Sequence, residues 1–159
     1  KIEEKLGSAS DTKLVKGVII DKTIDNSLMP RQISNAKIIL INEELDAVRT
    51  KTESEIIITS PEQMSSFLEA EKTEVLRKVK KIAESGANVV FSRKGISDMA
   101  QTYFARNGII SLRRVKENDL FWLEKATGAK ICQTIEKISP NEIGTVNHVY
   151  EKEIGDDKM

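Results

Sequence analysis

The fold class is decided by residues 85–120, which read SGANVVFSRKGISDMAQTYFARNGIISLRRVKENDL. In this stretch and in the residues after it, short apolar runs rich in β-branched side chains alternate with helix-like segments. The expected strands lie at 87–92, 109–114 and 129–133. The expected helices lie at 96–107 and 119–126. Because strands joined by helices imply right-handed crossovers between parallel neighbours, this half of the chain predicts an α/β layer.

Residues that favour helix termini mark both of these helices. The first can be capped by Ser97 or Asp98, and it stops at Gly108. The second can be capped by Asn118 and stopped by Gly128. Each helix therefore has a predicted start and end.

The first third of the chain has a different pattern, with three β-branched runs at 16–24, 35–41 and 53–59 that predict strands. Between the first two, Pro30 restricts the preceding residue to extended geometry. This segment therefore predicts a loop whose Leu28 and Met29 need not be buried. Together with an alternating strand pattern at 145–154, these runs predict two sheet layers plus helices.

A long helix is predicted between these two regions. Ser60 can cap it, Pro61 occupies its first position and Gln63 completes a capping box. Apolar residues then recur at helical spacing as far as Ala83, and Gly86 ends the run. The helix should have about 24 residues and a length of roughly 36 Å.

The apolar stripe of this helix is interrupted, since Glu71 and Lys72 occupy inward positions. Residues 41–71 also carry eight acidic and two basic side chains, a balance of −6. An acidic arm that projects with Met64, Phe67 and Leu68 is one interpretation, and an ordinary packed helix end is the other.

Composition narrows the function. A chain of 159 residues with 39% hydrophobic content suits one compact domain. Its net charge of +0 means that no overall electrostatic attraction draws it to nucleic acid or to an anionic membrane.

The sequence offers few residues for catalysis or cofactor binding. Neither GxxxxGK[ST] nor GxGxxG occurs, so no phosphate-binding loop is recognised. His148 is the sole histidine and lies in a predicted strand, which favours a structural or surface role. Cys132 is the sole cysteine and has no disulfide partner in the chain, as is usual in a reducing cytosol.

The basic segment 72–116 holds eleven basic and three acidic residues, a balance of +8, and keeps an RNA-binding module open as an alternative. It lacks a recognised nucleic-acid signature and interleaves few aromatic residues, so solvated helix faces and subunit contacts are the favoured explanation of this charge. A third possibility is an α/β enzyme with its site at strand ends near Gly95 and Gly128.

The stretch 85–120, followed by KATGAKI at 125–131, resembles the apical domain of group II chaperonins, the family of archaeal thermosomes and the eukaryotic cytosolic chaperonin. KGVIIDK, LMPRQISNAKIILI and the closing IGDDKM resemble it in the same order. The resemblance implies an α/β fold of three layers, β/β/α, over residues 1–159, with a helical protrusion at about 45–72 that forms part of a built-in lid.

The same resemblance implies a non-enzymatic fragment of a cytoplasmic, ATP-driven, two-ring machine. ATP and Mg would bind in the parent's equatorial domain, so no cofactor or metal is expected in this fragment. The partners would be non-native polypeptides and neighbouring chaperonin subunits, with no nucleic acid or membrane, and the isolated fragment would be monomeric.

In the family, polypeptide is captured in a shallow cleft between a helix resembling 97–107 and a loop resembling 25–32. On this basis we expect the binding residues to be Leu28, Met29, Thr102, Tyr103 and Arg106. Core packing against Met99 and Ala100 is the alternative role for Tyr103. For Met64, Phe67 and Leu68, we expect exposure on the lid. A thioether repacks readily against varied partners, so Met29 suits this task.

Overall fold

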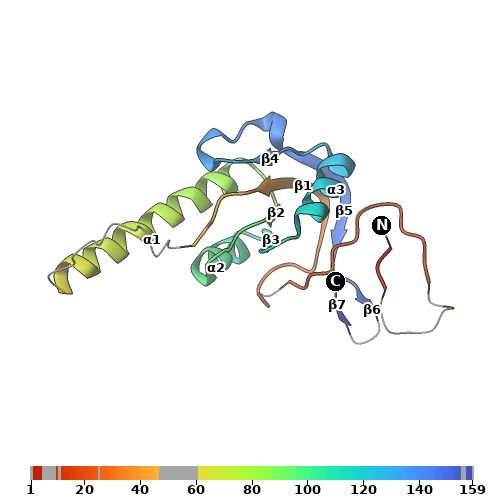
Figure 1. Cartoon of the computed structure of the whole chain (residues 1–159), viewed down its shortest axis with the longest axis horizontal. Coiled ribbons are helices and arrows are strands. Elements are labelled where there is room, and N and C mark those ends of the chain that lie inside the picture. Colours follow the sequence, from red (N-terminus) through yellow and green to blue (C-terminus); the bar gives the residue numbers. More distant parts are fainter. Residues whose placement is uncertain are drawn as a thin grey trace.

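The computed structural model describes residues 2–4, 10, 12–24, 26–46, 61–154 and 157–158, with side chains left undescribed at 61–68, 154 and 157–158. The strands are β1 (Gln32–Ile41), β2 (Val89–Ser92), β3 (Ile110–Leu112), β4 (Ile131–Cys132), β5 (Gly144–Tyr150), β6 (Glu153–Ile154) and β7 (Asp157–Lys158). The helices are α1 (Pro61–Glu84), α2 (Asp98–Arg106), α3 (Glu117–Thr127) and two short 3-10 helices, η2 (Ile135–Lys137) and η3 (Pro140–Glu142). Figure 1 shows their arrangement.

A five-stranded sheet is built around β1. Strands β2 and β3 continue it on one side in parallel, with Ile39 opposite Val90 and Val90 opposite Ser111. On its other side β1 pairs in parallel with β4 and antiparallel with β5. Strands β6 and β7 form a separate two-stranded ribbon. The predicted parallel neighbours are confirmed, and so is the α/β fold class.

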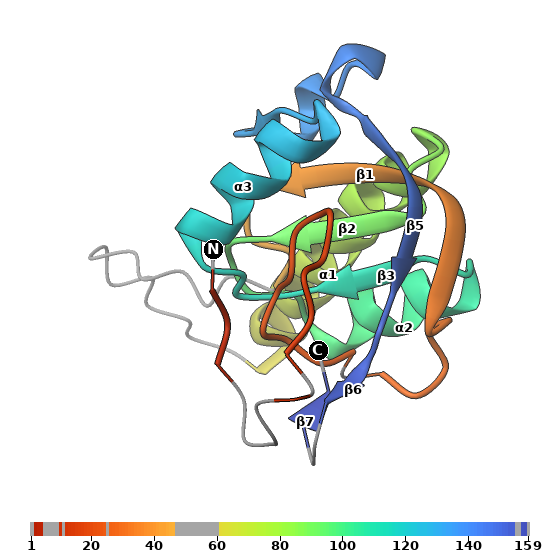
Figure 2. The ribbon, with the colours of Figure 1, turned by 90° about the vertical axis from the view of Figure 1, so that its right-hand side faces the viewer.

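The core lies on both faces of this sheet. The last four residues of β1, Ile38–Ile41, are almost fully buried, because strands flank them and side chains cover both faces. Figures 1 and 2 show α1 and α2 on one face and residues 12–24 on the other. The buried apolar residues among those described form one cluster, which includes Phe104 of α2 and Leu120 of α3.

The expected helices are all present. Helix α1 has 24 residues, and α2 is capped by Ser97, whose Oγ accepts a hydrogen bond from the Ala100 N–H at 3.4 Å. Helix α3 begins before the predicted start, so Asn118 lies inside it and Lys116 is the N-cap, without a side-chain cap bond. It ends as predicted at Gly128, which has a φ of 74°.

The strand predicted over 16–24 is wrong, since none of these residues belongs to a strand. Val18 and Ile20 are partly buried against the core and Ile24 is buried, so the run serves packing. The Ile24 N–H donates to Oε1 of Glu151 at 2.8 Å. A β-branched run becomes a strand only where it pairs with a neighbouring strand, and this run takes no part in the strand pairs of the described residues. The strand predicted at 53–59 and the predicted cap Ser60 lie outside the described residues.

Candidate functional site

The loop at residues 26–31, here called the Leu28 loop, turns an apolar side chain outward. The Leu28 N–H donates to Oδ1 of Asn26 at 2.9 Å, and the Met29 N–H donates to the Asn26 carbonyl oxygen at 3.1 Å. This side chain–backbone turn is typical of asparagine. It leaves the Leu28 side chain 69% exposed, as expected for a contact residue.

Met29 lies in the core, and the expectation that it is exposed is wrong. Its side chain is only 3% exposed, and its sulfur lies 3.5 Å from the Ser111 N and 3.8 Å from the Ser111 Oγ, both of which donate to it. Ser111 belongs to β3, so Met29 fixes the Leu28 loop to the edge of the sheet. The two adjacent apolar residues therefore have opposite roles: Met29 anchors the loop and Leu28 faces solvent.

A second anchor holds the other end of the loop. The Glu151 Oε2 accepts a hydrogen bond from Nη1 of Arg31 at 2.8 Å, and the Glu151 N–H donates to the Arg31 carbonyl oxygen at 2.9 Å. The same arginine nitrogen donates to the Ile24 carbonyl oxygen at 3.0 Å. The Glu151 side chain is mostly buried, so this pair is shielded from solvent more than a surface ion pair. The loop thus presents Leu28 from a rigid base.

Helix α2 carries the other predicted binding residues. Thr102 and Tyr103 are partly buried, and Tyr103 packs against the core, in agreement with the alternative role given to it. The Thr102 Oγ1 donates to the Asp98 carbonyl oxygen at 2.8 Å, while Arg106 is exposed. Both views in Figures 1 and 2 place the Leu28 loop beside α2. The structure therefore brings the predicted loop and helix together, with Leu28 and Arg106 at the surface.

The predicted protrusion is described only in part. Met64, Phe67 and Leu68 lie in α1, but their side chains are outside the described residues. Leu45, the predicted first residue of the protrusion, belongs to the body: it is buried, and its N–H donates to the Gly95 carbonyl oxygen at 3.0 Å. Figure 1 shows the amino-terminal turns of α1 extending beyond the sheet.

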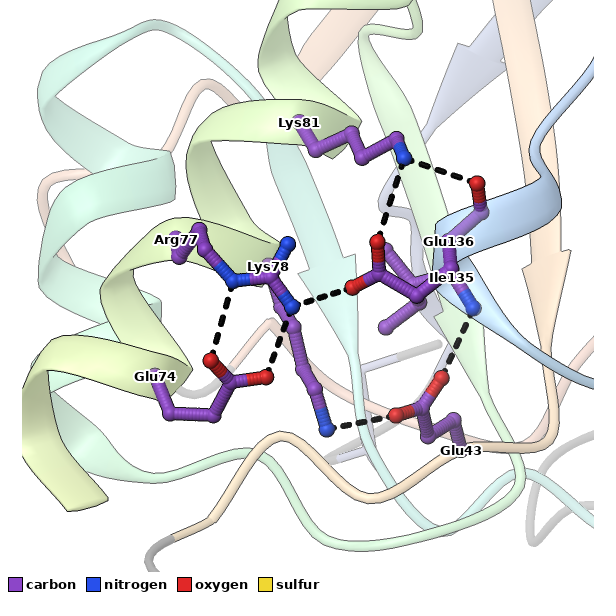
Figure 3. A network of polar contacts seen from close by, with 7 residues as sticks. All are labelled: Glu43, Glu74, Arg77, Lys78, Lys81, Ile135 and Glu136. Carbon is purple, nitrogen blue, oxygen red and sulfur yellow. Dashed lines mark hydrogen bonds and ion pairs between the residues drawn. The ribbon is translucent and has the colours of Figure 1, made fainter. Parts of the chain in front are cut away.

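A network of charged side chains lies where α1 leaves the body (Figure 3). We call it the α1 clasp, and it comprises Glu43, Glu74, Arg77, Lys78, Lys81 and Glu136. Arg77 donates to both carboxylate oxygens of Glu74, at 2.9 and 2.8 Å, and also to Glu136. Lys81 Nζ donates to the Glu136 carbonyl oxygen at 2.7 Å. These contacts join α1 to η2.

The second part of the α1 clasp reaches the end of β1. Lys78 Nζ lies 2.5 Å from Oε1 of Glu43, two residues beyond β1. The other oxygen of Glu43 accepts the Ile135 N–H at 2.7 Å. Sequence reasoning missed this network because its contacts join residues up to 92 positions apart. The one available signal was the pair of basic residues Arg77 and Lys78 directly before the apolar Val79.

The α1 clasp lowers the pKa of two carboxyl groups. Hydrogen bonding from Arg77 is the largest cause for Glu136, whose pKa falls from 4.5 to about 2, with Lys81 contributing. The same guanidinium lowers the pKa of Glu74. Both carboxylates are therefore held in their charged form.

This pKa shift predicts a pH-dependent contribution to stability. Because the folded pKa of Glu136 lies below its ordinary 4.5, its contribution is present above pH 4.5 and is lost as the pH falls toward 2. The wild type should exceed Glu136→Gln in melting temperature at pH 7, and the difference should shrink through that window. Melting curves of both proteins at several pH values measure this. A difference that stays constant down to pH 2 would contradict it.

Several basic residues of segment 72–116 are already paired within the molecule. Besides the α1 clasp, Arg93 Nη2 contacts Oε2 of Glu117 at 2.8 Å, and Arg113 Nη1 contacts Oδ1 of Asp98 at 3.4 Å. Partners from inside and outside the segment thus neutralise part of its positive charge. These contacts give no support to RNA binding by this segment.

The described residues show little chemistry of other kinds. Cys132 is buried, and desolvation is the main cause that raises the pKa of its thiol to about 12, so it is not a reactive thiolate. His148 is exposed on β5 with its ring centroid 5.6 Å from that of Tyr150. Among the described residues, no three His, Cys, Asp or Glu side chains are grouped to hold a metal. Nor does any described helix combine the length and apolarity needed to cross a bilayer.

One apolar surface was missed by sequence reasoning. Phe121 and Trp122 of α3 are each about half exposed, and their rings meet edge to face with centroids 5.6 Å apart. Lys125 Nζ lies 5.4 Å from the Phe121 ring centroid. The signal was present, because the helix also buries Leu120 and Leu123, and one face cannot cover four large neighbouring apolar residues.

Comparison with known proteins identifies the family. The sequence profile of the TCP-1/cpn60 chaperonin family matches residues 1–159. A thermosome subunit of Pyrococcus horikoshii is 48% identical and the thermosome subunit alpha of Archaeoglobus fulgidus is 43% identical, each over 100% of this chain. The chain covers 29% of the length of both relatives.

A solved structure agrees with these relatives. An open-state monomer of a group II chaperonin from Methanococcoides burtonii matches with a TM-score of 0.73 and 36% sequence identity. The match covers 96% of this chain and 32% of that one. Sequence and fold together show that this chain belongs to the TCP-1/cpn60 chaperonin family.

Proposed function

We propose that this chain is the apical domain of a group II chaperonin subunit and captures non-native polypeptide. The observation that carries the proposal is the Leu28 loop, which holds one exposed leucine beside α2 on a base fixed by Met29 and by the Arg31–Glu151 pair. A non-native chain presents mixed apolar and polar surface. Its receptor needs accessible apolar area without a demanding geometry, and Leu28 with the exposed Arg106 offers that combination.

The second part of the proposal concerns the lid. The amino-terminal turns of α1 extend away from the sheet, and residues 41–71 carry a charge balance of −6. We propose that the segment after Asp46 and the first half of α1 form a protrusion that helps to close a folding chamber. Met64, Phe67 and Leu68 would then contact neighbouring protrusions or client.

The remaining functions would belong to a longer protein, since this chain spans 29% of the length of the Pyrococcus horikoshii thermosome subunit. ATP and Mg would bind outside the chain, in an equatorial domain, and the chain itself would not be an enzyme. Ring neighbours would be its stable partners in the cytoplasm, and the isolated chain would be a monomer. Its client affinity would be weak, because several tethered sites of a ring normally act on one client.

The test is suppression of aggregation. A chemically unfolded client is diluted into increasing concentrations of this chain, and light scattering gives the concentration for half-suppression. Leu28→Ser should raise that concentration about fivefold, the equivalent of about 1 kcal/mol of lost apolar contact. Circular dichroism melting should show an unchanged fold, since the side chain is 69% exposed.

Two further variants make the result specific to the site. Leu14→Ser removes a leucine outside the Leu28 loop that is even more exposed than Leu28, and it should leave client capture unchanged. Phe121→Ser/Trp122→Ser tests the other apolar surface. If this variant alone suppresses aggregation less well, the client binds at α3 and the assignment of capture to Leu28 is rejected. Added salt should preserve apolar capture, whereas binding to a polyanion weakens steeply.

A further inference from the structure

Helix α1 is held by the body over only part of its length. Val75, Val79 and Ile82 are buried, whereas Glu69, Ala70 and Lys72 are exposed. Firm contact with the body therefore begins near residue 74, and the preceding turns extend outward (Figure 1). At about 1.5 Å per residue, the extending part is a lever of roughly 20 Å. A small change of angle at its base becomes a large displacement at its tip.

Apolar packing alone leaves this angle weakly determined. The buried side chains Val75, Val79 and Ile82 form a narrow stripe along one side of α1, and hydrophobic attraction is not directional. Hydrogen-bonded ion pairs do impose direction, because donors and acceptors must align. The α1 clasp lies at the level where the lever begins and supplies such contacts.

The α1 clasp also reaches two separate parts of the body. Lys78 contacts Glu43, just after β1, while Arg77 and Lys81 contact Glu136 in η2. Figure 3 shows the two arms leaving α1 toward different elements. Two divergent attachments resist rotation of the helix about its own axis as well as tilting.

Glu43 has a particular place in the chain. It precedes residues 47–60 and the first half of α1 in the sequence, whereas Lys78 follows them, so the contact joins two points that lie 35 residues apart along the chain. The Ile135 N–H holds the second oxygen of Glu43 at 2.7 Å, which fixes the carboxylate before Lys78 meets it. The partner of Lys78 is thus held in position by the backbone.

We propose that the Lys78–Glu43 and Arg77–Glu136 pairs are positioning contacts that hold the outward half of α1 in one direction relative to the sheet. Partly exposed ion pairs contribute little to global stability, so direction is what they would supply. The inference deepens the proposed lid role, on which its biological meaning rests. A lid made of several such levers requires each one to point the same way.

The experiment measures the direction of α1 with two spin labels. One label is placed on Ala70→Cys in α1 and the other on Asn147→Cys in β5, both exposed positions, while the native Cys132 thiol is buried. Pulsed electron–electron double resonance spectroscopy then gives the distribution of distances between the two labels. The chain with intact clasp should give one narrow distribution.

The test variant is Glu43→Gln/Glu136→Gln, which removes both negative charges and keeps an amide oxygen to accept the Ile135 N–H. Its distribution should be at least about twice as broad, since a tilt of about 20° moves residue 70, roughly 12 Å from Lys78, by about 4 Å. Its melting temperature should fall by no more than about 4 °C. Lys78→Arg keeps the charge and should keep the distribution narrow.

The control Arg93→Met removes the Arg93–Glu117 ion pair outside the clasp and should leave the distribution unchanged. An unchanged distribution in the double glutamine variant, with or without a lower melting temperature, overturns the proposal. A broad distribution in the chain with intact clasp overturns it as well. Client capture by Leu28 is read in a separate assay, so failure of either proposal is seen independently of the other.

Discussion

Replacement of Met29 by alanine should lower the free energy of unfolding by about 2–4 kcal/mol, the usual cost of truncating a buried methionine. The side chain is 3% exposed, and its sulfur accepts from the backbone and hydroxyl of Ser111. Its removal leaves a cavity beneath β3 and frees the Leu28 loop from the sheet. Urea unfolding followed by circular dichroism measures the loss.

The neighbouring residue provides the control for this experiment. Leu28→Ala should change the free energy of unfolding by less than about 0.5 kcal/mol, because its side chain is 69% exposed. In the aggregation assay both variants affect client capture, but for different reasons. Leu28→Ala removes the apolar side chain that contacts the client, whereas Met29→Ala frees the loop that holds this side chain in place. Equal stability of the two variants would contradict the anchoring role of Met29.

Gly144→Ala should destabilise the protein by about 3 kcal/mol, near the upper end of the usual cost of overpacking. A Cβ at Gly144 would lie 2.6 Å from the Thr127 Oγ1 and 2.7 Å from both the Thr127 carbonyl oxygen and the Ala129 N. Two of these atoms are backbone, so the end of α3 would have to move away from β5. Gly144 also pairs with Ile38 of β1, which prevents β5 from yielding instead.

Gly95→Ala is the matched control. Its Cβ would meet the Glu44 Oε1 at 3.2 Å and the Asp46 Oδ2 at 3.9 Å, both at the ends of exposed side chains that can swing aside. The expected change in the free energy of unfolding is below about 0.5 kcal/mol, helped by the lower entropy of the unfolded chain. A similar loss for both variants would show that space beside Thr127 is not the cause. Urea unfolding of the two variants decides this.

Much of the fold followed from local sequence signals. Ser97 and Gly128 marked helix ends that the structure confirms, because capping depends on residues within one turn. The alternation of strands and helices after residue 85 predicted the parallel sheet for a similar reason, since crossover handedness leaves few alternatives. The loop and the helix of the candidate site were also placed correctly beside each other, through the family resemblance.

The predictions that failed concern segments whose structure depends on residues distant in sequence but close in space. Residues 16–24 have the composition of a strand, yet they join neither sheet of the described residues, and the run packs on the core. Asn118 is a good capping residue by type, but α3 begins earlier, at Glu117, whose side chain pairs with Arg93. In both cases the local preference was worth less than contacts with distant residues.

The sequence by itself determined the α/β class, the position of the long helix and the family, since these depend on periodicity, caps and motifs that act over short distances. Tertiary structure alone decided which of Leu28 and Met29 faces solvent and how α1 is held at its base. The physical reason is that burial and ion pairing depend on contacts such as Met29–Ser111 and Lys78–Glu43, which join residues 82 and 35 positions apart. No local pattern encodes such pairs.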